Sequence, residues 1–93
     1  MLVGTCTIDL HLPENSSIKG KRKVVKSIVS RVKNRFNVSI AEIGDNDKWQ
    51  RIKLGFAMVS NDKKHVESAL TGVVNFIDSL CLAELIDYKI QIL

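Results

Sequence analysis

Basic side chains are concentrated between positions 19 and 35, where the sequence has eight lysines and arginines and no acid. The whole chain of 93 residues carries a net charge of +4, so its other residues together carry −4. Like charges four residues apart on a helix repel, and a purely solvated helix surface usually mixes both signs. An anionic partner would offset this repulsion, and phosphates attract basic surfaces whatever the base sequence. The expected phosphate contacts are Lys19, Lys21, Arg22, Lys23, Lys26, Arg31, Lys33 and Arg35.

A second cluster is expected where three predicted segments meet. These are the end of the strand at 2–12, the start of the helix that follows Ser17, and the 44–50 loop that leads back to the sheet. Free N–H groups at a helix start form an anion site together with nearby lysines, and an indole can stack on a base or a ribose. The candidate residues of this loop site are His11, Ser17, Trp49, Gln50 and Arg51. The alternative is that Trp49 packs over the sheet edge and that His11 pairs with Asp9.

Asp9 and His11 have a spacing that suits a catalytic base, because alternate residues of a strand share one face. The neighbouring strand is expected to bring Arg51 or Lys53 close to them. No nucleophile and no defined pocket accompany the pair, so a surface ion-pair network is the favoured interpretation. The sequence also has no phosphate-binding loop and no dinucleotide fingerprint. We therefore expect a protein without enzymatic activity and without a cofactor.

Metal binding is not expected, because the cysteines and histidines share no ligand spacing. Cys6 and Cys81 are isolated cysteines, which favours a reducing cytosol, and one disulfide between them is the alternative. The first residues lack the basic region of a signal peptide. No apolar run approaches the roughly 20 residues that a membrane helix needs. These features predict a cytoplasmic protein that does not contact a membrane.

Hydropathy periodicity predicts six elements in one domain, residues 1–93, of ordinary globular composition, with 45% hydrophobic and 26% charged residues. Apolar and polar residues alternate in four segments, which predicts strands at 2–12, 38–43, 51–60 and 86–92. Apolar residues recur at helical spacing from Ser17, as N-cap, to about position 36. They do so again from Asn61 or Asp62, as N-cap, to about position 80.

The order β-α-β-β-α-β predicts an α+β protein with the ferredoxin-like βαββαβ arrangement. Two helices should cover one face of a four-stranded antiparallel sheet, with the first and third strands at its centre. Alternate residues of these two strands should line the other face, which stays open. Residues 55–59 partly resemble an RNA-recognition strand motif, but Phe56 would point toward the helices and could not stack a base on the open face.

Several runs of this sequence resemble the YlxP-like family of small bacterial proteins of unknown function. The resemblance covers essentially the whole chain and rests on DLHLP at 9–13, SIK at 17–19 with KR at 21–22, NRFNVSIAEIG at 34–44, WQR at 49–51, LG at 54–55 and ND at 61–62. It implies a cytoplasmic bacterial protein with a ferredoxin-like fold. Genes of the family often lie beside those for transcription elongation, translation initiation and ribosome maturation factors. Gly20 departs from the family, whose members commonly carry an acidic or polar residue there.

Two functions of different classes are compatible with these patterns. The first is a non-enzymatic accessory protein that binds RNA or a ribosomal subunit through the basic helix. The second is a protein-interaction or homo-oligomerisation module that uses the open sheet face or an edge strand. The first predicts binding that weakens steeply with salt, and the second predicts a mass that depends on protein concentration.

Overall fold

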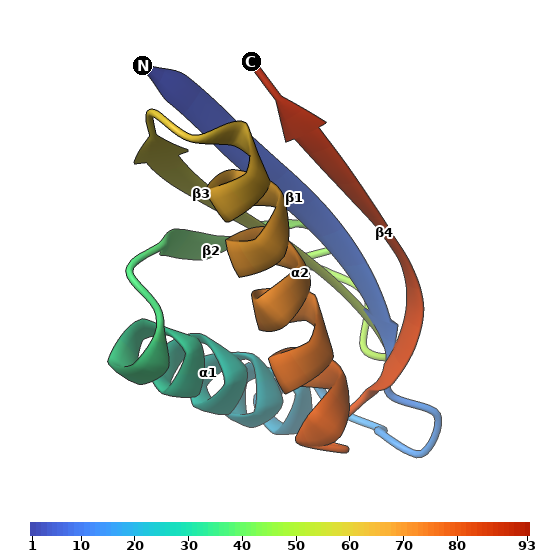
Figure 1. Ribbon diagram of the computed structural model, residues 1–93. Coiled ribbons are helices and arrows are strands. Elements are labelled where there is room, and N and C mark those ends of the chain that lie inside the picture. Colours follow the sequence, from blue (N-terminus) through green and yellow to red (C-terminus); the bar gives the residue numbers. More distant parts are fainter.

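Four strands form one antiparallel sheet, and both helices lie against the same face of it (Figure 1). The computed structural model describes residues 1–93. The elements are β1 (Leu2–His11), α1 (Ile18–Arg35), β2 (Ser39–Gly44), β3 (Arg51–Ser60), α2 (Lys63–Ser79) and β4 (Glu84–Ile92). The strands lie in the order β2-β3-β1-β4, which confirms the predicted ferredoxin-like arrangement with the first and third strands at the centre.

The helix starts follow from local capping. The Ser17 hydroxyl accepts a hydrogen bond from the Gly20 N–H at 3.0 Å, so the predicted N-cap of α1 is confirmed. For α2 the cap is Asp62, whose carboxylate accepts from the N–H groups of Lys64 and His65 at 3.0 and 3.3 Å. Each cap satisfies N–H groups that have no partner within the helix.

The last strand begins earlier than the sequence pattern predicts. β4 starts at Glu84, which pairs with His11, and Leu85 pairs with Leu10. The next pair is Asp9 with Asp87, so Ile86 is an extra residue in a β-bulge. A bulge interrupts the alternation of side chains. The periodicity therefore predicts only the portion of the strand from position 86 onward.

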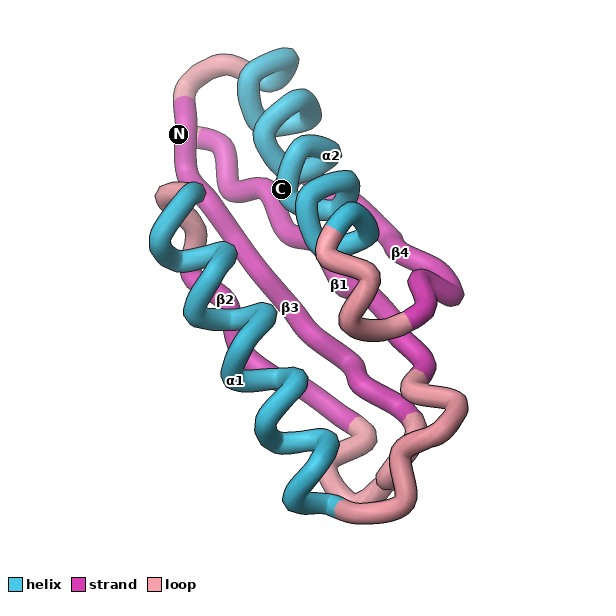
Figure 2. The backbone as a smooth tube through the Cα atoms, turned by 90° about the horizontal axis from the view of Figure 1, so that it is seen from below, coloured by secondary structure: helices cyan, strands magenta, loops and turns pink.

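The helix-facing side of the sheet holds the hydrophobic core. Alternate residues of β1 and β3 point inward and meet apolar residues of both helices. α2 packs over β1, β3 and β4, and α1 packs over β2 (Figure 2). The most deeply buried apolar residues are Ile8, Leu10, Val32, Ile52, Leu54, Val66, Leu70 and Val73. The predicted apolar faces of the two central strands are thus confirmed.

The opposite face of the sheet carries no helix, as predicted. Here β1 and β3 bring matched residues together, with Asp9 opposite Lys53 at the charged end and Val3 opposite Val59 at the apolar end. Ile43, which is 54% exposed, lies over Gly55 on this face. A Cβ atom at position 55 would approach Ile43 Cδ1 to 2.9 Å, so a glycine is needed beneath this side chain. The sequence pattern did not reveal this contact.

Candidate nucleic-acid interface

α1 presents most of its basic residues to solvent. Seven of the eight lysines and arginines between positions 19 and 35 are exposed. They are Lys19, Arg22, Lys23, Lys26, Arg31, Lys33 and Arg35. None of these seven forms an ion pair with a carboxylate of this chain. The acids elsewhere in the chain therefore leave this surface, the exposed basic surface of α1, without a direct counter-charge.

Two arginines of this surface are positioned by neighbouring side chains, and these contacts leave the arginine charges intact. The Arg31 Nε–H donates to Ser27 Oγ at 3.1 Å. The Arg35 guanidinium lies 5.0 Å from the centre of the Phe76 ring, a cation–π distance that links the end of α1 to α2. Neither contact neutralises a positive charge, so both groups remain able to attract an anion.

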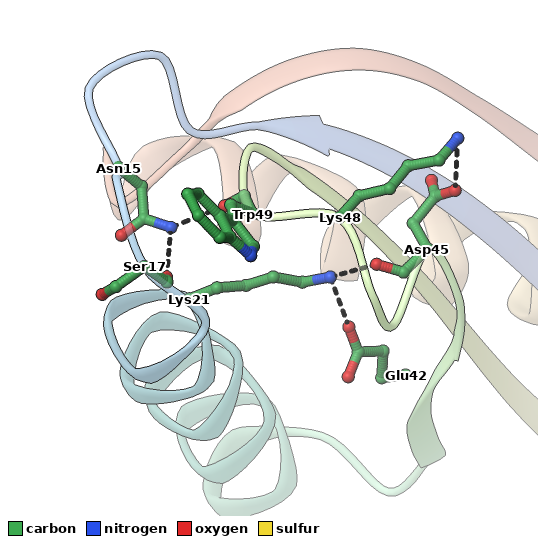
Figure 3. A network of polar contacts seen from close by, with 7 residues as sticks. All are labelled: Asn15, Ser17, Lys21, Glu42, Asp45, Lys48 and Trp49. Atoms are coloured by element: carbon green, nitrogen blue, oxygen red, sulfur yellow. Dashed lines mark hydrogen bonds and ion pairs between the residues drawn. The ribbon is translucent and has the colours of Figure 1, made fainter.

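Lys21 is buried, and its predicted role as a phosphate contact is wrong. Its side chain is 2% exposed, and Nζ lies 3.1 Å from Glu42 Oε2 (Figure 3). Nζ also donates to the backbone carbonyl of Asp45. Glu42 Oε2 accepts no hydrogen bond of good geometry, so its approach to Lys21 is an ionic contact. The ammonium group is thus already occupied by groups at the end of β2.

The position of Lys21 on the helix explains its burial. Residues 18, 21, 25, 28 and 32 follow each other at steps of three or four, so they lie on the face that packs on the sheet. Lys21 is the polar member of this apolar stripe, and its stem runs beneath Trp49 toward β2 (Figure 3). The same spacing is visible in the sequence and is the signal that would have separated Lys21 from the other basic residues.

Asn15 joins the turn before α1 to the loop before β3 (Figure 3). Its side-chain Nδ2 donates to the backbone carbonyl of Ser17 at 2.7 Å and to that of Trp49 at 2.5 Å. The Gln50 side chain adds hydrogen bonds to the carbonyls of Pro13 and Asn15, at 3.3 and 3.2 Å. Sequence reasoning missed Asn15 as a positioning residue. A turn asparagine beside a helix start is the signal that was available.

The Asn15 side chain occupies the space that a side chain at position 20 would fill, and Gly20 leaves this space open. A Cβ atom at position 20 would collide with Asn15 Oδ1 and would lie 3.2 Å from Ser17 Oγ. A glycine at position 20 therefore accommodates the Asn15 side chain that holds the two loops together.

The structure brings the residues of the predicted loop site to one end of the sheet. Ser17 and Trp49 are linked through Asn15, while His11 and Arg51 are direct partners across β1 and β3. Trp49 is 53% exposed, so about half of this side chain is open to solvent while the rest is covered by the chain. Its indole lies beside the start of α1 (Figure 3). An exposed, anchored aromatic ring next to lysines can stack on a nucleobase.

His11 and Asp9 form separate ion-pair contacts. The His11 Nδ1 lies 3.1 Å from Glu84 Oε2, so the expected pairing of His11 with Asp9 is wrong. Asp9 instead lies 3.9 Å from Lys53 Nζ. The expected proximity of Asp9 to Lys53 is confirmed, and the arrangement consists of two separate surface ion pairs. No group of three or more His, Cys, Asp or Glu side chains could hold a metal ion.

The two cysteines are free and differ in accessibility. Cys81 is exposed, whereas Cys6 is buried between the sheet and the helices. Burial raises the pKa of the Cys6 thiol from 9.0 to about 11, against a smaller lowering effect of the backbone at Lys89. Cys6 therefore stays a neutral thiol at physiological pH and packs as a small apolar residue.

The fold and this surface define a small ferredoxin-like α+β protein with a basic helix and an anchored tryptophan loop. The family described as a protein of unknown function, DUF503, matches residues 3–90, and the chain belongs to that family. Uncharacterized protein YlxP of Bacillus subtilis (strain 168) is 44% identical over 78 residues, which cover 84% of this chain and 85% of that protein. The resemblance to the YlxP-like family is thereby confirmed.

Solved structures share the fold at much lower identity. The de novo designed protein Foldit4 is 15% identical with a TM-score of 0.52, covering 99% of this chain and 94% of that one. An antibiotic biosynthesis monooxygenase is 14% identical with a TM-score of 0.51, covering 100% of this chain and 96% of that one. These likenesses concern the fold alone. None of the helices is both long enough and apolar enough to cross a membrane.

Proposed function

We propose that this protein is a non-enzymatic cytoplasmic accessory protein that binds RNA, free or within a ribosomal subunit. The observation that carries the proposal is the exposed basic surface of α1, whose seven cations have no carboxylate partner. An 18-residue helix is about 27 Å long, which is enough to follow several phosphates of one strand. Such contacts supply affinity and register but read no base sequence.

The loop site extends this surface at the start of α1. Trp49 is exposed, and Asn15 holds its backbone close to Ser17, so the indole is presented at the start of α1 at little cost in chain entropy. In this role Trp49 stacks on an unpaired base and Arg51 contacts the adjoining phosphate backbone. The Gln50 amide, which donates to the carbonyls of Pro13 and Asn15, supports the loop. His11, which is engaged with Glu84, lies at the margin of this contact.

The test is binding to structured RNA and to purified ribosomal subunits over a range of salt concentrations. We expect affinity to fall steeply with salt, and Lys23→Glu with Lys26→Glu to weaken binding to many RNAs alike. The matched control is Lys63→Glu with Lys64→Glu, which changes net charge equally on exposed residues of α2. A control that weakens binding as much as the α1 variant, or no binding at low salt, contradicts the proposal.

A further inference from the structure

β4 leaves one edge of the sheet without a partner strand. Val3 and Leu93 exchange two backbone hydrogen bonds, of 3.3 and 2.8 Å, so the backbone groups of Leu93 face β1. Backbone direction alternates along an antiparallel strand, hence residues 87, 89 and 91 also face β1. The N–H and C=O groups of Tyr88, Ile90 and Ile92 therefore point outward. This open row is a template for another strand.

We propose that β4 pairs antiparallel with β4 of a second copy of this chain, with Tyr88 on the two-fold axis. This register matches Tyr88 with Tyr88 of the second copy, and beyond it Ile90 meets the bulge at Ile86, where the regular ladder ends. Between them, Asp87 lies opposite Lys89 of the second copy, and the symmetry makes this pair twice. The sequence Asp-Tyr-Lys is thus complementary to itself in charge. Opposite charges directly across antiparallel strands stabilise the pairing.

Exposed apolar side chains lie at the same place on the edge. Ile86 is 48% exposed and Tyr88 is 45% exposed, although both belong to a strand beside the core. In the proposed pairing Tyr88 would contact Tyr88 of the second copy across the new strand boundary. The result is one continuous eight-stranded sheet, in the order β2-β3-β1-β4-β4-β1-β3-β2. α1 lies over β2, far from this junction, so the pairing leaves the exposed basic surface of α1 free.

In the monomer, the Asp87 side chain hydrogen-bonds to part of this strand edge. Asp87 faces Asp9 across β1 and β4, and like charges directly opposite repel. The Asp87 carboxylate turns to its own strand, where Oδ1 accepts from the Tyr88 N–H at 2.9 Å. Pairing must replace this hydrogen bond with one to the second copy, and Asp87 gains Lys89 instead. We therefore expect a weak dimer that forms only at high protein concentration, since a strand edge buries less area than a standard interface.

The test measures molecular mass by sedimentation equilibrium up to about 1 mM protein. The native chain should move from monomer toward dimer with rising concentration. Asp87→Lys places two lysine pairs across the junction and should weaken association about tenfold or more. Lys89→Asp should act in the same way. Asp87→Lys combined with Lys89→Asp restores both pairs and should restore association to within a few-fold of the native chain.

Each alternative result overturns the proposal. A monomer at every concentration excludes the pairing. A dimer that all three variants leave unchanged is formed by another surface, such as the open sheet face. A double variant that associates no better than the single variants excludes this register. Asp87→Lys removes the Asp9–Asp87 repulsion, so the variant should stay folded, and its circular dichroism spectrum checks this directly.

Discussion

Lys21 of α1 and Glu42 of β2 form an ion pair beneath the start of the helix, with 3.1 Å between Nζ and Oε2. The same ammonium group donates to the backbone carbonyl of Asp45, in the loop that follows β2. One member of a run of eight basic residues thus holds the helix on the sheet, and the other seven face solvent. Charge within this segment is thus divided between one buried ion pair and seven exposed side chains.

Lys21→Met should lower the free energy of unfolding by about 2 kcal/mol, because it leaves Glu42 and the Asp45 carbonyl without their cationic partner. Urea denaturation monitored by circular dichroism measures this loss. Lys23→Met is the matched control, since it removes the same charge from an exposed position and should change stability by less than about 0.5 kcal/mol. Equal effects of the two substitutions would contradict the structural role of Lys21.

When RNA binding is measured, Lys23→Met should have a larger effect than Lys21→Met, which is the reverse of their effects on stability. Lys23→Met removes one proposed phosphate contact, so the slope of log affinity against log salt should become shallower by about 0.7 for a single-stranded RNA. Lys21→Met should leave this slope unchanged at a temperature where the variant is fully folded. A loss of RNA affinity in folded Lys21→Met equal to that in Lys23→Met would show that burial does not separate the two roles.

Asn15→Ala should release the loop that carries Trp49. The substitution removes two hydrogen bonds to backbone carbonyls, and the expected loss of stability is about 1 kcal/mol. Trp49 fluorescence anisotropy should also decrease, since the exposed indole gains freedom. Asn46→Ala, in the same loop and without a side-chain hydrogen bond, is the control that should change neither value. Unchanged anisotropy in Asn15→Ala would mean that other contacts hold Trp49.

Cys6 should make stability fall at alkaline pH. Burial raises its pKa from 9.0 to about 11 in the folded chain, so the unfolded chain loses the thiol proton first as pH rises. This stabilisation is complete below pH 9 and is lost as pH approaches 11, by about 2 kcal/mol. Urea midpoints between these pH values measure the loss. Cys6→Ala is less stable throughout but should have a flatter profile, whereas Cys81→Ala should keep the native slope.

Most of the fold could be predicted because its strongest signals are local. β3 carries an uninterrupted alternation and its predicted bounds agree with the structure, Arg51–Ser60. β4 was predicted two residues short, because the bulge at Ile86 breaks the alternation on which the prediction depends. The contact of Ile43 with Gly55 joins two strands. Its existence depends on register, which a single strand does not encode.

The candidate site was predictable as a charge pattern and less so as a set of side-chain positions. The basic segment is visible in the sequence, yet Lys21 differs from its neighbours only by its place on the helix face. His11 had an acid two residues away, but its partner is Glu84, brought close by the pairing of the first and last strands. Contacts of this kind require the tertiary fold before they can be assigned.

β1 lies between β3 and β4, so the first strand of this domain to be synthesised pairs with the last strand of the domain. The reciprocal hydrogen bonds of Val3 with Leu93 close the sheet at the two ends of the described chain (Figure 1). While the ribosome is still making β4, the edge of β1 has no partner and part of the core is uncovered. The sheet is therefore completed only when β4 has left the ribosome, and a chain stalled before Glu84 would expose its central strand to other proteins.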